Sequence, residues 1–303
     1  MYVRTLVQGG ALPIVLLICS SCGNQQDIQG VAETSPVLSV SFDAIAQSAE
    51  PLRLPLSIIR SQPVTVITVG NRAVQAGVDT GGGGITLSED VIRSAGGVRL
   101  ADERVWNDAF GREFRVPQFT MPAMTIGGQT FHDVVVIQTA ESPEGQNPPA
   151  VPNGIGQHFL MRYFTVVDYA GLAMTLWPPG TELEASAACG TTPIPMEETE
   201  DVGLVVTVFD TPSGSFRLGW DTGATGSMIS EELVASLRLE TILRGQTSFY
   251  RPTRLTAAGQ DFGSLEFVVL PLQLPDFQGM LGANFFSDHV VCLDWKKREV
   301  RIR

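Results

Sequence analysis

Short apolar runs, rich in β-branched residues and bounded by turn residues, recur along most of the chain. Runs with this length and these boundaries are typical of β-strands. Helical signals are few: Ser88 and Ser230, each followed by acidic residues, are the expected N-caps of two short helices. The pattern therefore predicts a mainly β protein with many short strands. The clearest runs are residues 63–70, 131–138 and 164–169, and a hairpin over residues 201–221.

The chain contains one pattern twice. The segment VDTGGGGITLSEDVI aligns without gaps with WDTGATGSMISEELV, which places Asp79 opposite Asp221. Self-similarity along a whole chain predicts a tandem duplication. We expect a first lobe at residues 51–183 and a second lobe at residues 188–303. The other matching segments are 127–137 with 258–268, and 154–176 with 280–302.

The size and composition of the chain agree with two modest domains. It has 303 residues, of which 17% are charged and 44% are hydrophobic, an ordinary globular composition. The net charge of −12 argues against nucleic acid as a partner, because phosphate binding needs clustered Lys and Arg. The first copy is longer than the second. We expect its extra residues in the Pro- and Gly-rich segment 140–154, which predicts a long loop.

Residues 1–22 are predicted to be an export signal. Their apolar run is too short to span a bilayer, which needs about 20 residues. Cys22 follows two serines, as in a bacterial lipoprotein processing site, although Cys19 stands where Leu is usual. Lipidation of Cys22, which would anchor the protein to a membrane, and ordinary cleavage are both open. Either route predicts an exported protein, in the periplasm or as an outer-membrane lipoprotein of a bacterial cell envelope. Residues 23–50 would then be a tether or N-terminal extension.

Two cysteines, Cys189 and Cys292, remain in the predicted mature chain. In an oxidising compartment they either pair or stay as separate buried thiols, and the sequence leaves both open. Neither lies in a C-x-x-C pattern, and the chain has three histidines. We therefore expect no metal site and no cofactor.

The glycine run that follows Asp79 has three interpretations. A phosphate cradle is disfavoured, because the segment lacks the phosphate-binding patterns and a nearby Lys, and Asp79 would repel the anion. An Asp-Thr-Gly turn can be purely structural. The third interpretation presents a carboxylate at a strand end, with glycine leaving room for a substrate backbone. The duplication favours the third, because two related copies bring two Asp residues together about an approximate two-fold axis.

Two carboxyl groups a few ångströms apart share one proton, because they cannot both ionise. The ionised group then accepts a proton from water, while the protonated group polarises a carbonyl. Such a pair hydrolyses peptide bonds without a metal. The two D-T-G motifs, each matched with an apolar-Gly signature at residues 154–156 and 279–282, resemble those of retropepsin-like aspartic proteases.

This resemblance covers nearly all of the predicted mature chain. It implies a mainly β fold of two tandem closed-barrel lobes that form a pseudo-dimer within one chain. It also implies that Asp79 and Asp221 form the catalytic dyad. The residues that would support the dyad are Thr80 and Thr222, which hydrogen-bond across the lobe interface, Gly81 and Gly223, which leave room for substrate, and the Ile155-Gly156 and Leu281-Gly282 pairs behind the loops.

The resemblance further implies flaps that hold an extended peptide by strand addition. The first candidate is residues 104–116, a predicted hairpin with its turn near residues 107–111, and the second is residues 244–257. Trp106 and Phe110 either contact substrate or pack on their own lobe, and both interpretations are open.

Two departures from the family pattern fall in the first copy. Gly82 stands where Ala or Ser is usual, and Ile85 stands where Ser227 matches the pattern in the second copy. Since glycine loses more entropy on ordering, we expect a looser first loop. Both Asp residues and both Thr residues are nevertheless retained.

The leading function is an exported aspartic endopeptidase that acts as a monomeric pseudo-dimer on an extended peptide or unfolded protein segment. The alternative is a non-catalytic protein that binds extended peptides on the same scaffold. A missing Asp would mark that alternative, and neither Asp is missing. In a third arrangement, each lobe pairs with the matching lobe of another chain.

Overall fold

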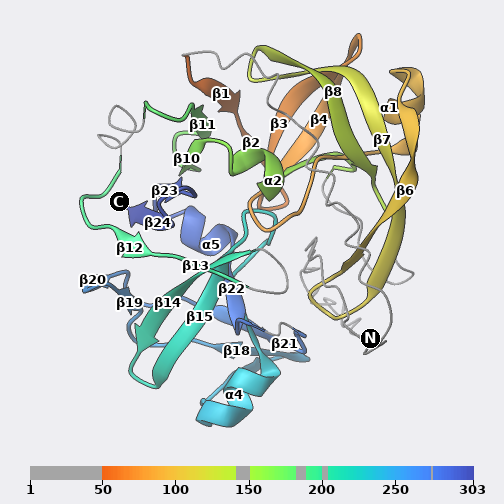
Figure 1. The fold of residues 1–303 in the computed structure, drawn as a ribbon. Coiled ribbons are helices and arrows are strands. Elements are labelled where there is room, and N and C mark those ends of the chain that lie inside the picture. The colour runs from red at the N-terminus through yellow and green to blue at the C-terminus, as the bar shows by residue number, and fades with distance from the viewer. Residues whose placement is uncertain (1–49, 141–150, 182–188, 200–203, 274–275) are drawn as a thin grey trace, which may run out of the picture.

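The computed structural model describes residues 50–140, 151–181, 189–199, 204–273 and 276–303, which form three β-sheets and four short helices. The prediction of a mainly β protein with two lobes is confirmed (Figure 1). Within the described residues, no helix is long and apolar enough to cross a membrane. The predicted signal at 1–22, the lipidation candidate Cys22 and nearly all of the tether lie outside the described residues.

The first half of the chain forms an eight-stranded sheet in the order β2-β3-β4-β9-β5-β8-β7-β6. An additional pairing between β3 and β7 closes six of these strands into a barrel. The side chains of β4 alternate, with Val74, Ala76 and Val78 buried, as a strand with one face on a core requires. The bounds are β2 Ser57–Ile59, β3 Gln62–Val69, β4 Arg72–Asp79, β5 Thr86–Leu87, β6 Val98–Asn107, β7 Glu113–Ile126, β8 Gln129–Gln138 and β9 Gly154–Gly156.

The second half forms a ten-stranded sheet in the order β17-β18-β21-β16-β22-β15-β14-β19-β20, with β13 paired to β14. The described pairings do not close this sheet in the same way. The predicted hairpin over 201–221 is present as β14 and β15. The bounds are β13 Glu197–Glu198, β14 Val205–Thr211, β15 Gly214–Trp220, β16 Met228–Ser230, β17 Ile242–Arg244, β18 Thr247–Tyr250, β19 Thr256–Ala257, β20 Gln260–Asp261, β21 Phe267–Leu270 and β22 Gly279–Leu281.

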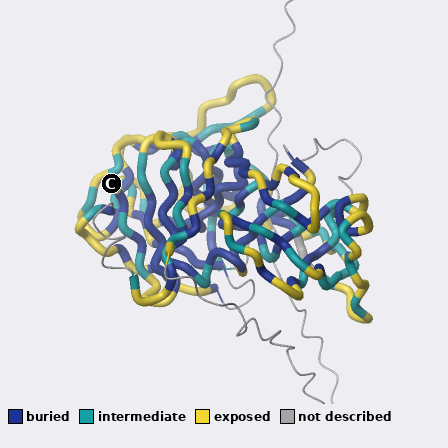
Figure 2. Tube along the Cα trace, turned by 90° about the horizontal axis from the view of Figure 1, so that it is seen from above, coloured by how far each residue is buried: buried dark blue, intermediate teal, exposed yellow. Residues whose placement is uncertain are grey.

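The third sheet takes strands from both halves, in the order β1-β11-β10-β23-β24-β12. The two halves meet where β10 pairs antiparallel with β23, with Val166 opposite Cys292. Buried residues run through both halves without a break, and exposed residues concentrate at the turns (Figure 2). The bounds are β1 Leu52–Pro55, β10 Phe164–Asp168, β11 Ala173–Trp177, β12 Ile194–Pro195, β23 Val291–Asp294 and β24 Glu299–Ile302.

The helices begin where the sequence predicted. Helix α1 (Glu89–Ser94) follows Ser88 and α4 (Glu231–Leu237) follows Ser230. The two caps differ, because the Ser230 side chain accepts the Leu233 N–H at 3.1 Å, whereas the Ser88 hydroxyl donates to Asp90. Single turns α2 (Gln157–Leu160) and α5 (Ala283–Phe286) follow the two apolar-Gly signatures.

Equivalent pairings show that the two halves repeat. Thr86 lies opposite Ile137, and Met228 lies opposite Val268, so residues that the sequence alignment matches occupy equivalent places in the two halves. The location expected for the extra residues of the first copy was largely wrong. The sequence offset between the copies is 142 from Thr86 to Met228 and 131 from Ile137 to Val268, so 11 extra residues lie between β5 and the end of β8. There the long β6–β7 hairpin replaces the short β17–β18 hairpin.

Cys189 and Cys292 form a disulfide, with their Cα atoms 6.0 Å apart and a sequence separation of 103 residues. This bond fastens the segment between the halves to β23 in the shared sheet. Both cysteines are buried, with 8% and 1% of their surfaces exposed. The bond therefore restrains the unfolded chain across most of the second half.

We expect the double substitution Cys189→Ser and Cys292→Ser to lower the free energy of unfolding by about 2–4 kcal/mol, because the unfolded chain regains the entropy that the long closed loop removes. Denaturant unfolding of the parent and the variant measures this difference. An unchanged midpoint would contradict the expected contribution of the disulfide.

Candidate active site

Asp79 and Asp221 lie at equivalent strand ends. Asp79 is the last residue of β4, and Asp221 follows the last residue of β15. Each strand runs parallel to a strand that carries an apolar-Gly signature, so that Val78 lies opposite Ile155 and Trp220 lies opposite Leu281. These ladders hold each Asp at the edge of its lobe, where a loop replaces the strand.

The two loops cross so closely that each glycine covers the carboxyl group of the other lobe. A Cβ atom added at Gly81 would lie 2.7 Å from Cγ of Asp221, and one added at Gly223 would lie 2.6 Å from Cγ of Asp79. Real Cβ atoms do not approach other atoms that closely, so only glycine fits at either position. The space that the sequence analysis assigned to substrate is therefore needed first by the carboxyl groups themselves.

Thr80 and Thr222 connect the loops by reciprocal hydrogen bonds. Each hydroxyl accepts the backbone N–H of the other threonine at 3.0 Å. Each hydroxyl also donates to a strand carbonyl of the other lobe, Thr80 to Trp220 at 2.9 Å and Thr222 to Val78 at 2.7 Å. Both side chains are almost completely buried. The hydrogen bonds that the resemblance implied for these residues are present.

Two residues that the sequence analysis did not assign also connect the halves here. The Tyr169 hydroxyl donates to the Thr222 carbonyl at 3.1 Å, and its ring stacks on Phe286. The Gln62 amide nitrogen donates to the carbonyl of Gly223. The alignment of Asp168-Tyr169 with Asp294-Trp295 was a signal for Tyr169. No repeated signal marked Gln62, because its counterpart in the second copy is Leu204.

The electrostatics of the two carboxyl groups are unequal. Burial raises the pKa of Asp79 to about 6, although hydrogen bonds from neighbouring groups, including the N–H groups of Gly81 and Gly82, oppose this shift. Burial and then the charge of Asp79 raise the pKa of Asp221 well above its usual value. Asp221 is 0% exposed, and its Oδ2 atom has no hydrogen-bond partner among the described residues. The shared proton therefore belongs mainly to Asp221.

The loops are supported differently in the two lobes. In the second lobe, the Ser227 hydroxyl donates to Asn284 at 2.7 Å and accepts the N–H of Gly282 at 3.0 Å. In the first lobe, Ile85 replaces this serine and is buried in the core. The Gly82 carbonyl accepts the N–H of Gln157 at 2.6 Å, as the Ala224 carbonyl accepts the N–H of Ala283 at 3.0 Å in the second lobe, and the Gly83 carbonyl also accepts the N–H of His158 at 2.8 Å.

The departure at Gly82 also has a steric cause. A Cβ atom added there would lie 2.7 Å from Oδ2 of Asp79. An alanine at this position would therefore displace the carboxylate. Its counterpart Ala224 likewise donates its N–H to the Asp of its own lobe, at 3.0 Å, and its methyl group lies in an apolar cluster of the second half.

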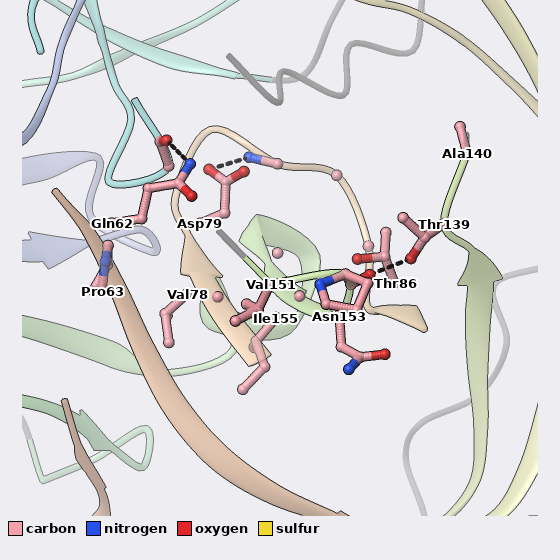
Figure 3. A pocket seen from close by; sticks show the side chains of 18 residues that line it. Gln62, Pro63, Val78, Asp79, Thr86, Thr139, Ala140, Val151, Asn153 and Ile155 are labelled. Carbon is pink, nitrogen blue, oxygen red and sulfur yellow. Dashed lines mark hydrogen bonds between the residues drawn. The ribbon is translucent and has the colours of Figure 1, made fainter. Parts of the chain in front are cut away.

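A pocket of about 680 Å³, including space open to solvent, extends from Asp79 into the first lobe. Figure 3 shows Gln62 and Asp79 together at one end, and Thr139 and Ala140 at the other. Glycines make up much of the wall, which leaves space where side chains would otherwise stand. The glycines that line it are Gly77, Gly82, Gly83, Gly84, Gly154, Gly156 and Gly223.

The first predicted flap is the end of the β6–β7 hairpin, whose turn spans residues 108–112. In Figure 1 this hairpin extends beyond its own sheet toward the second half of the chain. Phe110 packs against an apolar cluster of the second half and not on its own lobe, which was one of the two interpretations left open for it. The side chain of Trp106 lies outside what the structure describes. The second candidate flap begins in the β17–β18 hairpin.

Within the described ranges, no group of three or more His, Cys, Asp or Glu residues is arranged to hold a metal ion.

Comparisons with known proteins give a fold. No family model matches the chain, and no curated protein matches it. Among solved structures, the chain is similar to the crystal structure of the aspartic proteinase from Irpex lacteus, with a TM-score of 0.56 and 13% sequence identity. The match covers 84% of this chain and 97% of that chain. The likeness shows that the chain has the fold of an aspartic proteinase.

We expect Thr80→Val to lower the free energy of unfolding by about 2–3 kcal/mol, because the Thr222 N–H and the Trp220 carbonyl lose their partners in a buried place. Denaturant unfolding measures the loss. The matched control is Thr253→Val at an exposed loop position, which should change stability by less than about 0.5 kcal/mol. Equal effects of the two substitutions would refute the role of the threonine bonds.

The effect of Asp79→Asn on the free energy of unfolding, relative to the parent, should be more favourable at pH 7 than at pH 4. The pKa of Asp79 in the folded parent, about 6, lies above its ordinary value of 3.8. Between pH 4 and pH 6 the folded parent therefore binds more protons than the unfolded chain, and its free energy of unfolding falls as pH rises. The variant lacks this titration. The stability difference between variant and parent should therefore increase by about 1–3 kcal/mol from pH 4 to pH 7.

Thermal unfolding of both proteins at the two pH values tests this prediction. Taking the difference between pH values removes any pH-independent loss from the substitution. A difference that stays constant or decreases toward pH 7 would show that the pKa of Asp79 is not raised.

Proposed function

We propose that this protein is an aspartic endopeptidase of the retropepsin-like kind, in which Asp79 and Asp221 activate a water molecule. The observation that supports it best is the mutual burial of the two carboxyl groups, each covered by a glycine of the other lobe. A purely structural Asp-Thr-Gly turn does not need a second carboxylate beside it. Burying two acids together destabilises a fold, so a buried pair of this kind points to a function.

The two carboxyl groups would have different roles. Asp79 accepts hydrogen bonds from the N–H groups of Gly81 and Gly82. These bonds stabilise its ionised form, so Asp79 would take the proton from water. Asp221 is the more deeply buried and would keep its proton, so it would donate a hydrogen bond to the carbonyl of the scissile bond. After the attack, the proton held by Asp79 would pass to the leaving amine.

The proposed substrate is an extended peptide or unfolded protein segment. The pocket beside Asp79 is concave, has a mostly apolar wall and is large enough for a side chain. Its glycines would allow close approach of a substrate backbone, and the pocket would receive a large apolar side chain. The reciprocal threonine bonds and the shared sheet support action by one chain as a pseudo-dimer.

We further propose that the protein acts after export, in the periplasm or from an outer membrane through lipidated Cys22. The basis is the sequence of residues 1–22, together with the disulfide between Cys189 and Cys292, since disulfides persist in oxidising compartments. The lobes would then extend over residues 51–183 and 188–303.

The parent should cleave fluorescein-labelled casein, and Asp79→Asn and Asp221→Asn should each lower kcat/KM at least about 10³-fold, because each removes one partner of the acid–base pair. In the parent, kcat/KM should fall below about pH 6, where Asp79 takes up a proton and ceases to be a base. Soluble protein that lacks residues 1–22 is assayed from pH 4 to pH 8.

Asp210→Asn, at an exposed position outside the site, is the matched control and should retain parental activity. Cleavage that survives Asp79→Asn alone would indicate that second lobes pair between chains. A folded parent that binds labelled casein but does not cleave it at any pH would favour the peptide-binding alternative.

A further inference from the structure

The pocket in the first lobe has a counterpart in the second lobe, and the two differ. The aligned ladders assign each pocket residue to a position in the other half. Five residues that line the pocket are Gln62, Gly82, Thr86, Val151 and Gly154. Their counterparts are Leu204, Ala224, Met228, Phe277 and Met280, which are all buried members of one apolar cluster. Side chains fill in the second lobe the space that is open in the first.

One member of that cluster does not come from the second lobe. Ala109, at the tip of the β6–β7 hairpin, is 1% exposed and belongs to the same cluster, and Phe110 packs against it. The N–H of Gln273 donates to the Ala109 carbonyl at 2.7 Å. The hairpin of the first lobe is therefore inserted into the second lobe, at the two-fold counterpart of the open pocket.

The tip is shaped to present these two residues. The Asp108 carboxylate accepts the N–H groups of Phe110 at 2.9 Å and Arg112 at 3.0 Å, and the Arg112 guanidinium donates back to it at 2.6 Å. The guanidinium also lies over the rings of Phe110 and Phe114. The tip is thus a preformed turn that carries a small and a large apolar side chain.

We propose that the hairpin tip occupies, in the free protein, the place of an apolar substrate side chain on the second lobe, so that the tip and the peptide compete. This inference rests on the proposed function, because it deepens the description of the same cleft. The tip binds where the duplication predicts the second side-chain pocket, and it uses apolar contacts and a backbone hydrogen bond, as an extended peptide does. The free protein is then self-inhibited, and its apparent affinity for substrate is reduced by the fraction of molecules with the tip inserted.

Ala109→Asp tests the proposal by placing a charge in the buried cluster, which should expel the tip. The matched control is Ala101→Asp, at an exposed position on the same hairpin. We expect Ala109→Asp to lower KM for fluorescein-labelled casein at least about 10-fold, and Ala101→Asp to leave it unchanged. Hydrogen exchange at the Gln273 amide, whose acceptor is Ala109, should accelerate in the first variant alone.

A reversible lock provides an independent test. A Cβ atom added at Gly111, where φ is +75°, would lie 3.4 Å from Cβ of Gln273, so the double substitution Gly111→Cys and Gln273→Cys places the two Cβ atoms close to the separation found in disulfides. The oxidised variant should lose casein binding and cleavage, and mild reduction should restore both. The parent receives the same reductant, because its own disulfide must be shown to be unaffected.

The outcomes separate this inference from the proposed function. Faster exchange at Gln273 together with weaker cleavage by Ala109→Asp would show that the inserted tip is the productive form, which overturns the inference. An oxidised lock that binds casein as well as the reduced form does also overturns it. If no variant cleaves at any pH, casein binding decides: tighter binding by Ala109→Asp in an Asp79→Asn background supports the inference, and unchanged binding overturns it.

Discussion

The hydroxyl groups of Thr80 and Thr222 each accept an N–H group and donate to a carbonyl of the opposite lobe, which leaves four buried backbone groups dependent on two side chains. Only two loops in register can satisfy this arrangement. Once it forms, the crossing of the loops follows, and with it the position of each glycine over the other carboxyl group. The raised pKa values are a consequence of this geometry, because the same contacts that align the loops also exclude water from both carboxyl groups.

The sequence predicted the features that repeat. Strand positions followed from the apolar runs, the starts of α1 and α4 from Ser88 and Ser230, and the equivalence of Asp79 and Asp221 from the alignment of the two copies. The features that it missed occur once. Gln62 has an apolar counterpart, and the contact of Ala109 with the second lobe joins residues about 160 positions apart without any repeated signal. The extra length of the hairpin was assigned to a loop, because Pro and Gly content predicts flexibility but not where a strand is extended.

The two lobes support their Asp-Thr-Gly loops with different sets of contacts. Both loops accept an equivalent backbone bond, at Gly82 and Ala224; the second lobe adds side-chain bonds through Ser227 and Asn284, whereas the first has a buried Ile85 and a bond from the His158 N–H to the Gly83 carbonyl. Glycine at position 82 accompanies this difference, since the first loop lies too close to Asp79 for a methyl group. What the sequence suggested to be a looser loop is thus a loop with other restraints. The asymmetry extends to the carboxyl groups, because Asp79 accepts hydrogen bonds from the N–H groups of Gly81 and Gly82, whereas Oδ2 of Asp221 has no partner among the described residues.

A single chain can keep such differences, whereas a symmetric dimer of identical lobes cannot. In a homodimer, any side chain that fills one pocket fills both, and any extension of one hairpin appears twice. Here the first lobe keeps an open, glycine-lined pocket and contributes the long hairpin, while the second lobe has Met228, Phe277 and Met280 at the corresponding wall. Duplication within one chain therefore separates two tasks that symmetry would couple: one lobe retains the space beside the carboxyl groups, and the other provides the surface on which the hairpin closes.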